Sequence, residues 1–273
     1  GLWTDGRYFV QAEKQLEGST VTLYRMAEEG VPAVEEFVKD KLPQGGCIGF
    51  DGRTVNGAWG EKFVAIAEEK KGSLFVGEDL INLIWTDRPE LSKAPLFILE
   101  EKYSGKSTAE KIKDVRAKMA EEGADIHILT SLCDIAWLLN IRGGDIQSVP
   151  VVLSYLVLTR DQCIWFLQEE VVDDTIRAYL KENHIETRPY DDIYTYVPTI
   201  PESTVVLMNK SSVNYRICSE LNKNIQVINK PNPTELMKQS RIRLRWITPA
   251  LHMSKTVAVT KFMYWLKKNV GKT

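Results

Sequence analysis

Apolar residues in this chain follow helical and strand-like spacings in alternation from one end to the other. One helical face is marked by steps of four, four and three residues through Val55, Trp59, Phe63 and Ile66. Short apolar runs at residues 47–50, 74–76 and 96–99 are typical of strands lying between such helices. The alternation predicts an α/β fold, in which helices cover the faces of a sheet.

Two longer apolar runs predict that the sheet is mixed and not purely parallel. Residues 151–158 and 163–167 are joined by the short polar segment 159–162. A connection this short joins antiparallel neighbours, so we expect a β-hairpin. Further strands are expected at residues 126–129 and 205–208.

Capping signals indicate where one central helix begins and ends. Ser107 or Thr108 is expected to cap it, because both side chains can accept hydrogen bonds from the first-turn amides. Gly123 is expected to end it. Its buried stripe is expected to consist of Ile112, Val115 and Met119.

Weaker signals mark two helices nearer the N-terminus. Asp5 is expected to cap a first helix that runs to Leu16. Pro32 is expected in the first turn of a second helix, where a missing backbone N–H costs nothing.

Length and a polar stretch predict two domains followed by the start of a third. At roughly 100–200 residues per domain, 273 residues accommodate about two. The polar residues 100–107 separate them, so we expect one domain over residues 1–105 and a second over residues 106–240. Residues 241–273 contain an apolar helix, which we expect to be the first helix of a third domain whose remainder is absent. Because no Met begins the chain, we also expect the front of the first domain to be cut.

Charge and composition exclude several classes of partner. The net charge is −2 and the pI is about 6.1, so no basic field favours nucleic acid or an anionic membrane. No apolar run approaches the roughly 20 residues of a membrane-spanning helix, and the first residues resemble no signal peptide. The cysteines lie far apart, without a CxxC pair, at Cys47, Cys133, Cys163 and Cys218. They predict reduced, mostly buried thiols in a cytoplasmic protein, with a disulfide or a metal site as the alternative.

Catalytic motifs give no local signal in this chain. Its histidines are His127, His184 and His252, and none lies in an HExxH or similar ligand pattern. We therefore expect structural or surface histidines, and neither a catalytic residue nor a metal site in this chain. Cys133 has no histidine placed beside it by the local pattern, so a buried thiol is expected there.

Two further motifs have plain structural interpretations. Residues 104–107 (SGKS) resemble the end of a phosphate-binding loop, but Glu100 stands where that motif needs glycine. A linker followed by a helix cap is therefore expected. Arg241, Arg243 and Arg245 alternate with apolar residues, which favours a solvated face or a contact between domains over an anion-binding face.

Several segments of the chain together resemble one family. Residues 3–9 read WTDGRYF, residues 83–89 read LIWTDRP and residues 134–143 read DIAWLLNIRG. Pro150, Ser154 and Tyr155 follow in matching order, as do residues 211–215 (SSVNY) and 231–233 (PNP). Over nearly its whole length the chain resembles the amino-terminal region of cytosolic-type, three-domain Xaa-Pro aminopeptidases (aminopeptidase P) of the creatinase/prolidase superfamily.

The resemblance implies a fold and an activity. It implies two tandem mixed-sheet domains of the creatinase N-terminal type, with ribonuclease-H-like topology, ahead of a pita-bread domain that holds two divalent metals, manganese in these enzymes. Enzymes of this family remove the N-terminal residue from peptides whose second residue is proline. The metal ligands lie in the third domain, so the 273-residue chain itself is expected to be inactive. Its expected contribution is to the substrate entrance and to the contacts of a homodimeric full-length protein, with proline-containing peptides as partners.

One residue role is carried over by the resemblance. The arginine of the WTDGR segment contacts bound peptide in the family, and that position is Arg7 here. A guanidinium stays charged and offers planar donors to a carbonyl or carboxylate oxygen. The alternative is that Arg7 merely pairs with a nearby acid such as Asp5.

The start of the expected third domain departs from the family. Residues 240–249 (SRIRLRWITP) lack the acidic KNxxE pattern, and His252 aligns with a family histidine although its flanks differ. This departure concerns the junction to the third domain. A second hypothesis also stays open, namely a non-catalytic peptide- or protein-binding module of the same superfamily. The three motifs together favour the three-domain aminopeptidase over a creatinase or a prolidase.

Overall fold

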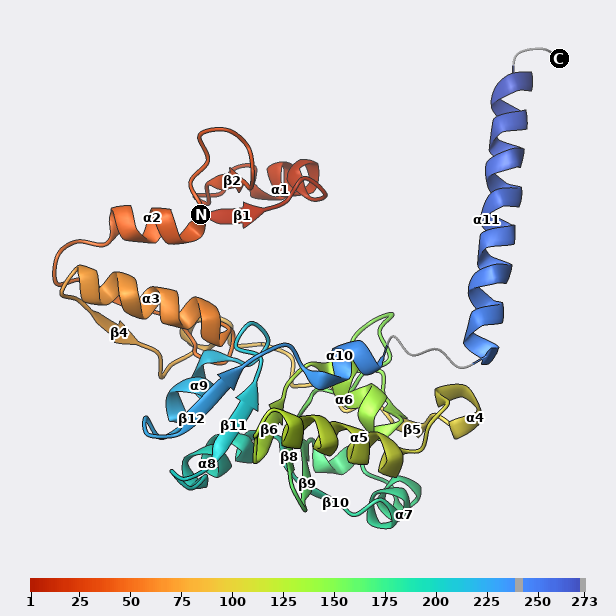
Figure 1. Cartoon of the computed structure of the whole chain (residues 1–273). Coiled ribbons are helices and arrows are strands. Elements are labelled where there is room, and N and C mark those ends of the chain that lie inside the picture. The colour runs from red at the N-terminus through yellow and green to blue at the C-terminus, as the bar shows by residue number, and fades with distance from the viewer. Residues whose placement is uncertain (239–242, 271–273) are drawn as a thin grey trace. The chain divides into compact units, whose positions relative to one another are not determined.

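The structure is a computed structural model that describes residues 1–238 and 243–270. Contacts between Cα atoms divide the chain into two compact units (Figure 1). The first unit comprises Gly1–Arg88 together with Asn214–Cys218, and the second comprises Pro89–Val213 together with Ser219–Thr273. Residues 89–105 thus pack with the second unit, whereas we expected the first domain to extend to residue 105.

The reason for this difference lies in a small antiparallel pair of strands. Strand β5 (Phe97–Ile98) pairs with β7 (Ile141–Arg142), and the Leu99 N–H donates to the Asn140 carbonyl at 2.7 Å. Leu96 is buried in the hydrophobic core of the second unit. The strand that was expected to end the first domain therefore belongs to the second unit.

The first unit contains two parallel strand pairs. Strand β1 (Leu2–Thr4) pairs with β2 (Leu23–Arg25), and β3 (Cys47–Gly49) pairs with β4 (Ser73–Phe75). Its helical elements are α1 (Phe9–Leu16), α2 (Val34–Lys41), α3 (Gly57–Glu69), the 3₁₀ helix η1 (Leu80–Leu83) and the beginning of α9 (Tyr215–Glu220).

Helix α3 forms where the four-four-three spacing predicts it. The side chain of Asn56 caps it by accepting from the Trp59 N–H at 2.9 Å. Gly60 lies against the ring of Tyr215, where a Cβ atom would come within 1.9 Å of that ring. A residue with a side chain would therefore displace Tyr215, so glycine is required for α9 to pack on α3.

The second unit is built on a six-stranded mixed sheet with the strand order β10-β9-β8-β6-β11-β12. Its strands are β6 (Ile126–Leu129), β8 (Ser154–Thr159), β9 (Cys163–Leu167), β10 (Ile185–Pro189), β11 (Val205–Met208) and β12 (Gln226–Asn229). Strands β8 and β9 form the expected antiparallel hairpin, and β8 is also antiparallel to β6. The pairs β6/β11, β11/β12 and β9/β10 are parallel, so the predicted mixed α/β character is confirmed.

The second unit contains several helices, among them the one predicted to begin at Ser107 or Thr108. They are α4 (Glu101–Ser104), α5 (Thr108–Glu121), α6 (Leu132–Leu139), α7 (Asp174–Glu182), α8 (Ile193–Tyr196), α10 (Pro233–Met237) and α11 (Arg243–Asn269), joined by short 3₁₀ turns at Glu169–Val171, Tyr190–Asp192 and Val197–Thr199. Ser107 caps α5 by accepting from the Glu110 N–H at 3.3 Å, and the Glu110 carboxylate accepts from the Ser107 N–H at 3.0 Å. Gly123 ends this helix with φ +73°. The SGKS segment is therefore a linker followed by a cap, as predicted.

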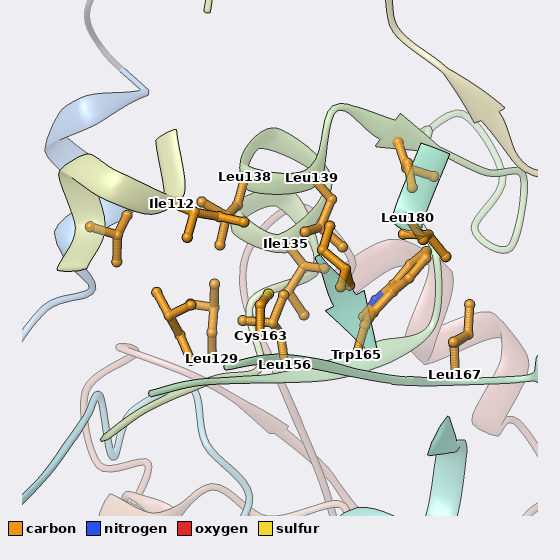
Figure 2. Packing of buried hydrophobic residues seen from close by; sticks show 14 of the residues in the cluster. Ile112, Leu129, Ile135, Leu138, Leu139, Leu156, Cys163, Trp165, Leu167 and Leu180 are labelled. Carbon is orange, nitrogen blue, oxygen red and sulfur yellow. The ribbon is translucent and has the colours of Figure 1, made fainter. Parts of the chain in front are cut away.

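The main core lies between one face of this sheet and helices α5, α6 and α7 (Figure 2). The predicted buried stripe of α5 is confirmed, since Ile112, Val115 and Met119 are all buried. Each such side chain contributes roughly 1.5–3 kcal/mol when it is removed from water. From the sheet, this core takes Leu129, Leu156, Trp165 and Leu167.

Two expected helix starts are wrong. Helix α1 begins at Phe9 after Tyr8, and Asp5 does not cap it because Arg7 occupies the Asp5 carboxylate. Helix α2 begins at Val34, so Pro32 lies two residues before its first turn.

Helix α11 confirms that the C-terminal region is helical. Many of its apolar side chains are exposed, namely Val257, Val259, Phe262, Met263, Trp265 and Leu266. No helix in the described part of the chain is long and apolar enough to cross a membrane. The assignment of residues 241–273 to a third domain stays a prediction. Arg241 and the side chains of Arg243, Arg245 and His252 lie outside the described residues.

Candidate substrate-contact site

Trp3 anchors the N-terminal strand of the first unit. Its ring stacks on Tyr24 with the ring centroids 4.1 Å apart and 7° between the planes, and Phe37 packs edge-on against both rings. The indole N–H donates to the carbonyl of Pro32 at 2.9 Å. Because these contacts fix Trp3, the segment that follows β1 and contains Asp5 and Arg7 begins at a fixed position.

Asp5 binds both the backbone and the side chain of Arg7. Its Oδ1 accepts from the Arg7 backbone N–H at 3.0 Å and from Nε at 2.9 Å, while Oδ2 accepts from Nη2 at 2.7 Å. Such a forked, charge-assisted pair fixes the plane of the guanidinium. The guanidinium also lies over the ring of Tyr8, 5.6 Å from its centroid.

Arg7 is held in place although most of its side chain is exposed. The exposed fraction is 79% for Arg7 and 46% for Asp5. Asp5 engages the Nε–Nη2 edge of the guanidinium, so the donors of Nη1 remain outside this fork. Exposed donors in a fixed plane are suited to bind a carbonyl or carboxylate oxygen.

Asp5 and Arg7 each favour the charged form of the other. Hydrogen bonds from the Arg7 side chain, and then from its backbone N–H, lower the pKa of Asp5 to about 2. Asp5 in turn raises the pKa of Arg7 through the same hydrogen bonds. At neutral pH the pair is therefore a carboxylate beside a guanidinium and carries no net charge.

The tripeptide Asp-Gly-Arg occurs again at residues 51–53 and folds in the same way. Asp51 accepts from the backbone N–H of Arg53 at 2.9 Å, from its Nε at 3.1 Å and from its Nη2 at 3.0 Å. The fork is therefore a local property of this tripeptide. Arg53, however, is 38% exposed and lies 3.8 Å from Asp79, so its guanidinium is partly buried among acidic groups. Of the two arginines, Arg7 is the one available to a ligand.

The LIWTDRP motif at residues 83–89 contains Arg88, which joins two parts of a loop in the first unit. Arg88 donates to the carboxylate of Asp79 at 2.5 Å and to the side-chain oxygen of Asn82 at 2.7 Å. Its guanidinium lies over the ring of Trp85, 5.7 Å from the centroid. The contacts give Arg88 a structural role, which the motif by itself did not reveal.

Two of the three histidines have described side chains, His127 in a strand and His184 in a turn. His127 is fully buried in β6, and its Nδ1 lies 3.0 Å from the Leu207 carbonyl oxygen. Burial lowers the pKa of His127. The hydrogen bond with the Leu207 carbonyl and the negative charge of Asp134 raise this pKa by smaller amounts. His184 adopts φ +54° in the turn before β10. Within the described ranges, no three His, Cys, Asp or Glu side chains gather in a way that could hold a metal ion.

The cysteines are free, but the expectation that most are buried is wrong. Cys47 and Cys133 are exposed, Cys218 is half-buried and Cys163 is buried. Burial raises the pKa of the Cys163 thiol to about 12, so this thiol is unreactive at neutral pH. Cys133 is exposed because α6 turns its neighbours Asp134 and Ile135 inward instead.

A buried polar cluster in the second unit escaped the sequence reasoning. Asp134 is completely buried, and Asn232 donates to its Oδ2 at 3.0 Å. The ammonium of Lys238 lies against its Oδ1 as an ion pair, although that oxygen accepts no well-aligned hydrogen bond. A pocket of about 460 Å³ lies beside Asn232, between the end of α5, β11 and residues 230–237. The one local signal was an aspartate inside an otherwise apolar helix.

The sheet, its helices and the motifs on them define a class of domain. Residues 87–242 match the family model described as the creatinase/prolidase N-terminal domain. This match covers more than half of the chain and begins close to Pro89, where the second compact unit begins. The chain therefore belongs to the creatinase/prolidase N-terminal domain family, which confirms the resemblance.

Proteins similar to this chain over nearly its whole length are Xaa-Pro aminopeptidases. Probable Xaa-Pro aminopeptidase P of Coprinopsis cinerea is 32% identical over 99% of this chain and 46% of that protein. Xaa-Pro aminopeptidase 1 of Dictyostelium discoideum is 30% identical over 98% of this chain and 44% of that protein. The chain therefore spans a little less than half the length of these curated relatives.

A solved structure agrees with these relatives. The X-prolyl aminopeptidase of Caenorhabditis elegans, described as a cytosolic enzyme with a di-nuclear active site, superposes with a TM-score of 0.85. It is 27% identical, and the match covers 98% of this chain and 45% of that enzyme.

Proposed function

We propose that this chain is the amino-terminal portion of a metal-dependent Xaa-Pro aminopeptidase. The whole enzyme would release the N-terminal residue from peptides with proline in second position. The names of the relatives support this activity. The observation that carries the proposal is Arg7, an exposed guanidinium in a fixed plane within the WTDGRYF segment.

Several further features belong to this proposal. Two domains precede the catalytic domain, and the first gives way to the second near Pro89 and not at residue 105. Residues 241–273 are the start of the catalytic domain. The enzyme is cytoplasmic and homodimeric, and this portion contributes to the substrate entrance and to the contacts between subunits. The description of the nematode enzyme as cytosolic supports the proposed location.

The proposed metal chemistry lies outside this chain. The described residues offer no group of three His, Cys, Asp or Glu side chains that fits a metal ion. In our proposal, two divalent metals, namely manganese, belong to a catalytic domain elsewhere in the polypeptide. When bound, such metals polarise a carbonyl group and activate water. No residue of this chain is given a part in that chemical step.

Arg7 acts on substrate binding in this proposal. Its free donors bind an oxygen of the peptide and orient the chain in the entrance. A hydrogen bond to a charged group contributes roughly 1.5–3 kcal/mol. Loss of this contact should therefore raise KM by roughly tenfold or more.

The proposal is tested with the purified chain and with the full-length natural polypeptide that contains it. With added Mn²⁺ and the peptide Arg-Pro-Pro, the chain should show no hydrolysis and the full-length polypeptide should release arginine. Hydrolysis by the chain would contradict the placement of the metal site. A full-length polypeptide that binds the peptide without cleaving it would favour the binding-module hypothesis instead.

A further inference from the structure

We propose that Asp5 is the positioning residue of this site: it fixes the peptide-contacting edge of Arg7 and weakens the preference of that edge for a carboxylate over a neutral carbonyl oxygen. This inference rests on the proposed function of Arg7 as a peptide contact. It adds a second residue and a chemical preference to that site. Both follow from the geometry of the fork between Asp5 and Arg7.

Asp5 restricts the orientation of the Arg7 guanidinium. A side chain that is 79% exposed has little packing to hold it and would otherwise sample many rotamers. Oδ1 of Asp5 accepts from both the backbone N–H and Nε of Arg7, so the carboxylate ties the guanidinium to its own main chain. The other carboxylate oxygen, Oδ2, accepts a hydrogen bond from Nη2 and fixes the rotation of the guanidinium plane. A ligand therefore meets donors that are already oriented, which lowers the entropy cost of binding.

Asp5 also places a negative charge beside the Arg7 guanidinium. The Asp5 oxygens lie 2.9 and 2.7 Å from Nε and Nη2, so a negative charge adjoins the cation on one edge. A carboxylate that approached the other edge would be attracted by Arg7 and repelled by Asp5. A neutral carbonyl oxygen gains the same hydrogen bonds without this repulsion. Asp5 therefore reduces the advantage that a carboxylate would have over a neutral carbonyl oxygen, while Arg7 supplies the donors.

At Asp51 and Arg53 the same fork occurs without a largely exposed guanidinium. The same hydrogen bonds form there, yet that guanidinium is half as exposed and also lies near Asp79. Asp5 has a positioning role because the arginine it holds is open to solvent on its other edge.

The kinetic test uses the full-length natural polypeptide, loaded with Mn²⁺, and proline-containing peptides of two to four residues, each as the free acid and as the C-terminal amide. One of these peptide lengths should place its C-terminus beside Arg7. For that peptide, the KM of the free acid divided by the KM of the amide should fall by roughly two- to fivefold in Asp5→Asn. Asp5→Glu keeps the charge but not the geometry, so it should preserve this ratio and raise both KM values. Glu186→Gln removes a carboxylate from a similar pair with Arg188 in the second unit and should change neither quantity.

A second measurement needs no activity. In the chain alone, the Arg7 Nε–H signal in a ¹⁵N-correlated NMR spectrum should be protected from exchange in the natural sequence. In Asp5→Asn this protection should fall toward that of a free arginine. Protection that survives unchanged in Asp5→Asn would overturn the inference.

The kinetic outcomes separate the inference from the function on which it rests. If Arg7→Ala leaves KM and kcat unchanged, the proposed function of Arg7 fails. If Arg7→Ala raises KM while Asp5→Asn leaves both KM values and their ratio unchanged, the peptide contact stands and the role of Asp5 is wrong.

Discussion

The ammonium of Lys238 lies against the carboxylate of Asp134, which is buried at the start of α6. Asn232 donates to the other oxygen of the same carboxylate at 3.0 Å. Two residues of the segment 232–238 are thereby joined to the motif at residues 134–143. This gives the aspartate of that motif a structural role inside the second unit.

Asp134→Ala should destabilise the second unit by roughly 2–4 kcal/mol, because it leaves a lysine and an amide donor without their buried partner. The measurement is urea unfolding followed through the amide signals of β6. Asp114→Ala is the matched control, since Asp114 pairs with Lys106 on the surface, and it should cost less than about 1 kcal/mol. Equal effects of the two variants would contradict the importance of the buried pair.

Trp3→Ala should loosen the N-terminal part of the first unit. The variant removes the stack on Tyr24 and the hydrogen bond to Pro32, for an expected loss of about 2–4 kcal/mol. Hydrogen exchange at β2 reports this loss directly, because Leu2 and Leu23 lie opposite each other in the strand pair. Tyr8→Ala removes an exposed aromatic residue and should change exchange at β2 very little.

Features of the fold that depend on neighbouring residues could be predicted. Helix α5 follows from one capping residue, Ser107, and from an apolar stripe at helical spacing. The hairpin of β8 and β9 follows from two apolar runs and a connection too short for a crossover. Each of these signals lies within about 15 residues of the element it defines, so no tertiary information was needed.

Features that depend on competing or distant partners could not be predicted. Asp5 has the side chain of a helix cap, but a nearer donor, Arg7, takes its carboxylate, so α1 begins without it. Asp134 is buried with Lys238 and Asn232 as partners, and Asn232 lies 98 residues away from it in the sequence. The orientation of Cys133 away from the core depends on the same packing. The spacing of residues contains no information about such partners.

The carboxyl group of Asp5 should titrate well below an ordinary aspartate. Its pKa is lowered from 3.8 to about 2 by hydrogen bonds from Arg7, so the fork is complete above pH 3.8 and is lost as the pH falls through about 2. The check is a ¹³C NMR titration of the side-chain carboxyl. Arg7→Gln should return the midpoint toward 3.8, and a midpoint near 3.8 in the natural sequence would contradict the fork.

His127 should make the second unit less stable in mild acid. Burial lowers its pKa from 6.5, so the unfolded chain binds a proton that the folded unit does not. The stability is therefore complete above pH 6.5 and decreases as the pH falls from there toward the folded-state pKa. Urea unfolding at about pH 7.5 and 5.5 measures this loss, which should be smaller in His127→Gln. An identical pH dependence in both proteins would show that His127 does not contribute.

The most direct test of the account is the KM for Arg-Pro-Pro of the full-length polypeptide that contains this chain, compared between the natural sequence and Arg7→Ala. The account predicts release of arginine by both proteins, with KM raised roughly tenfold or more in the variant and kcat changed far less. A KM that is the same in both proteins would contradict it, because the exposed guanidinium held by Asp5 would then play no part in binding the peptide.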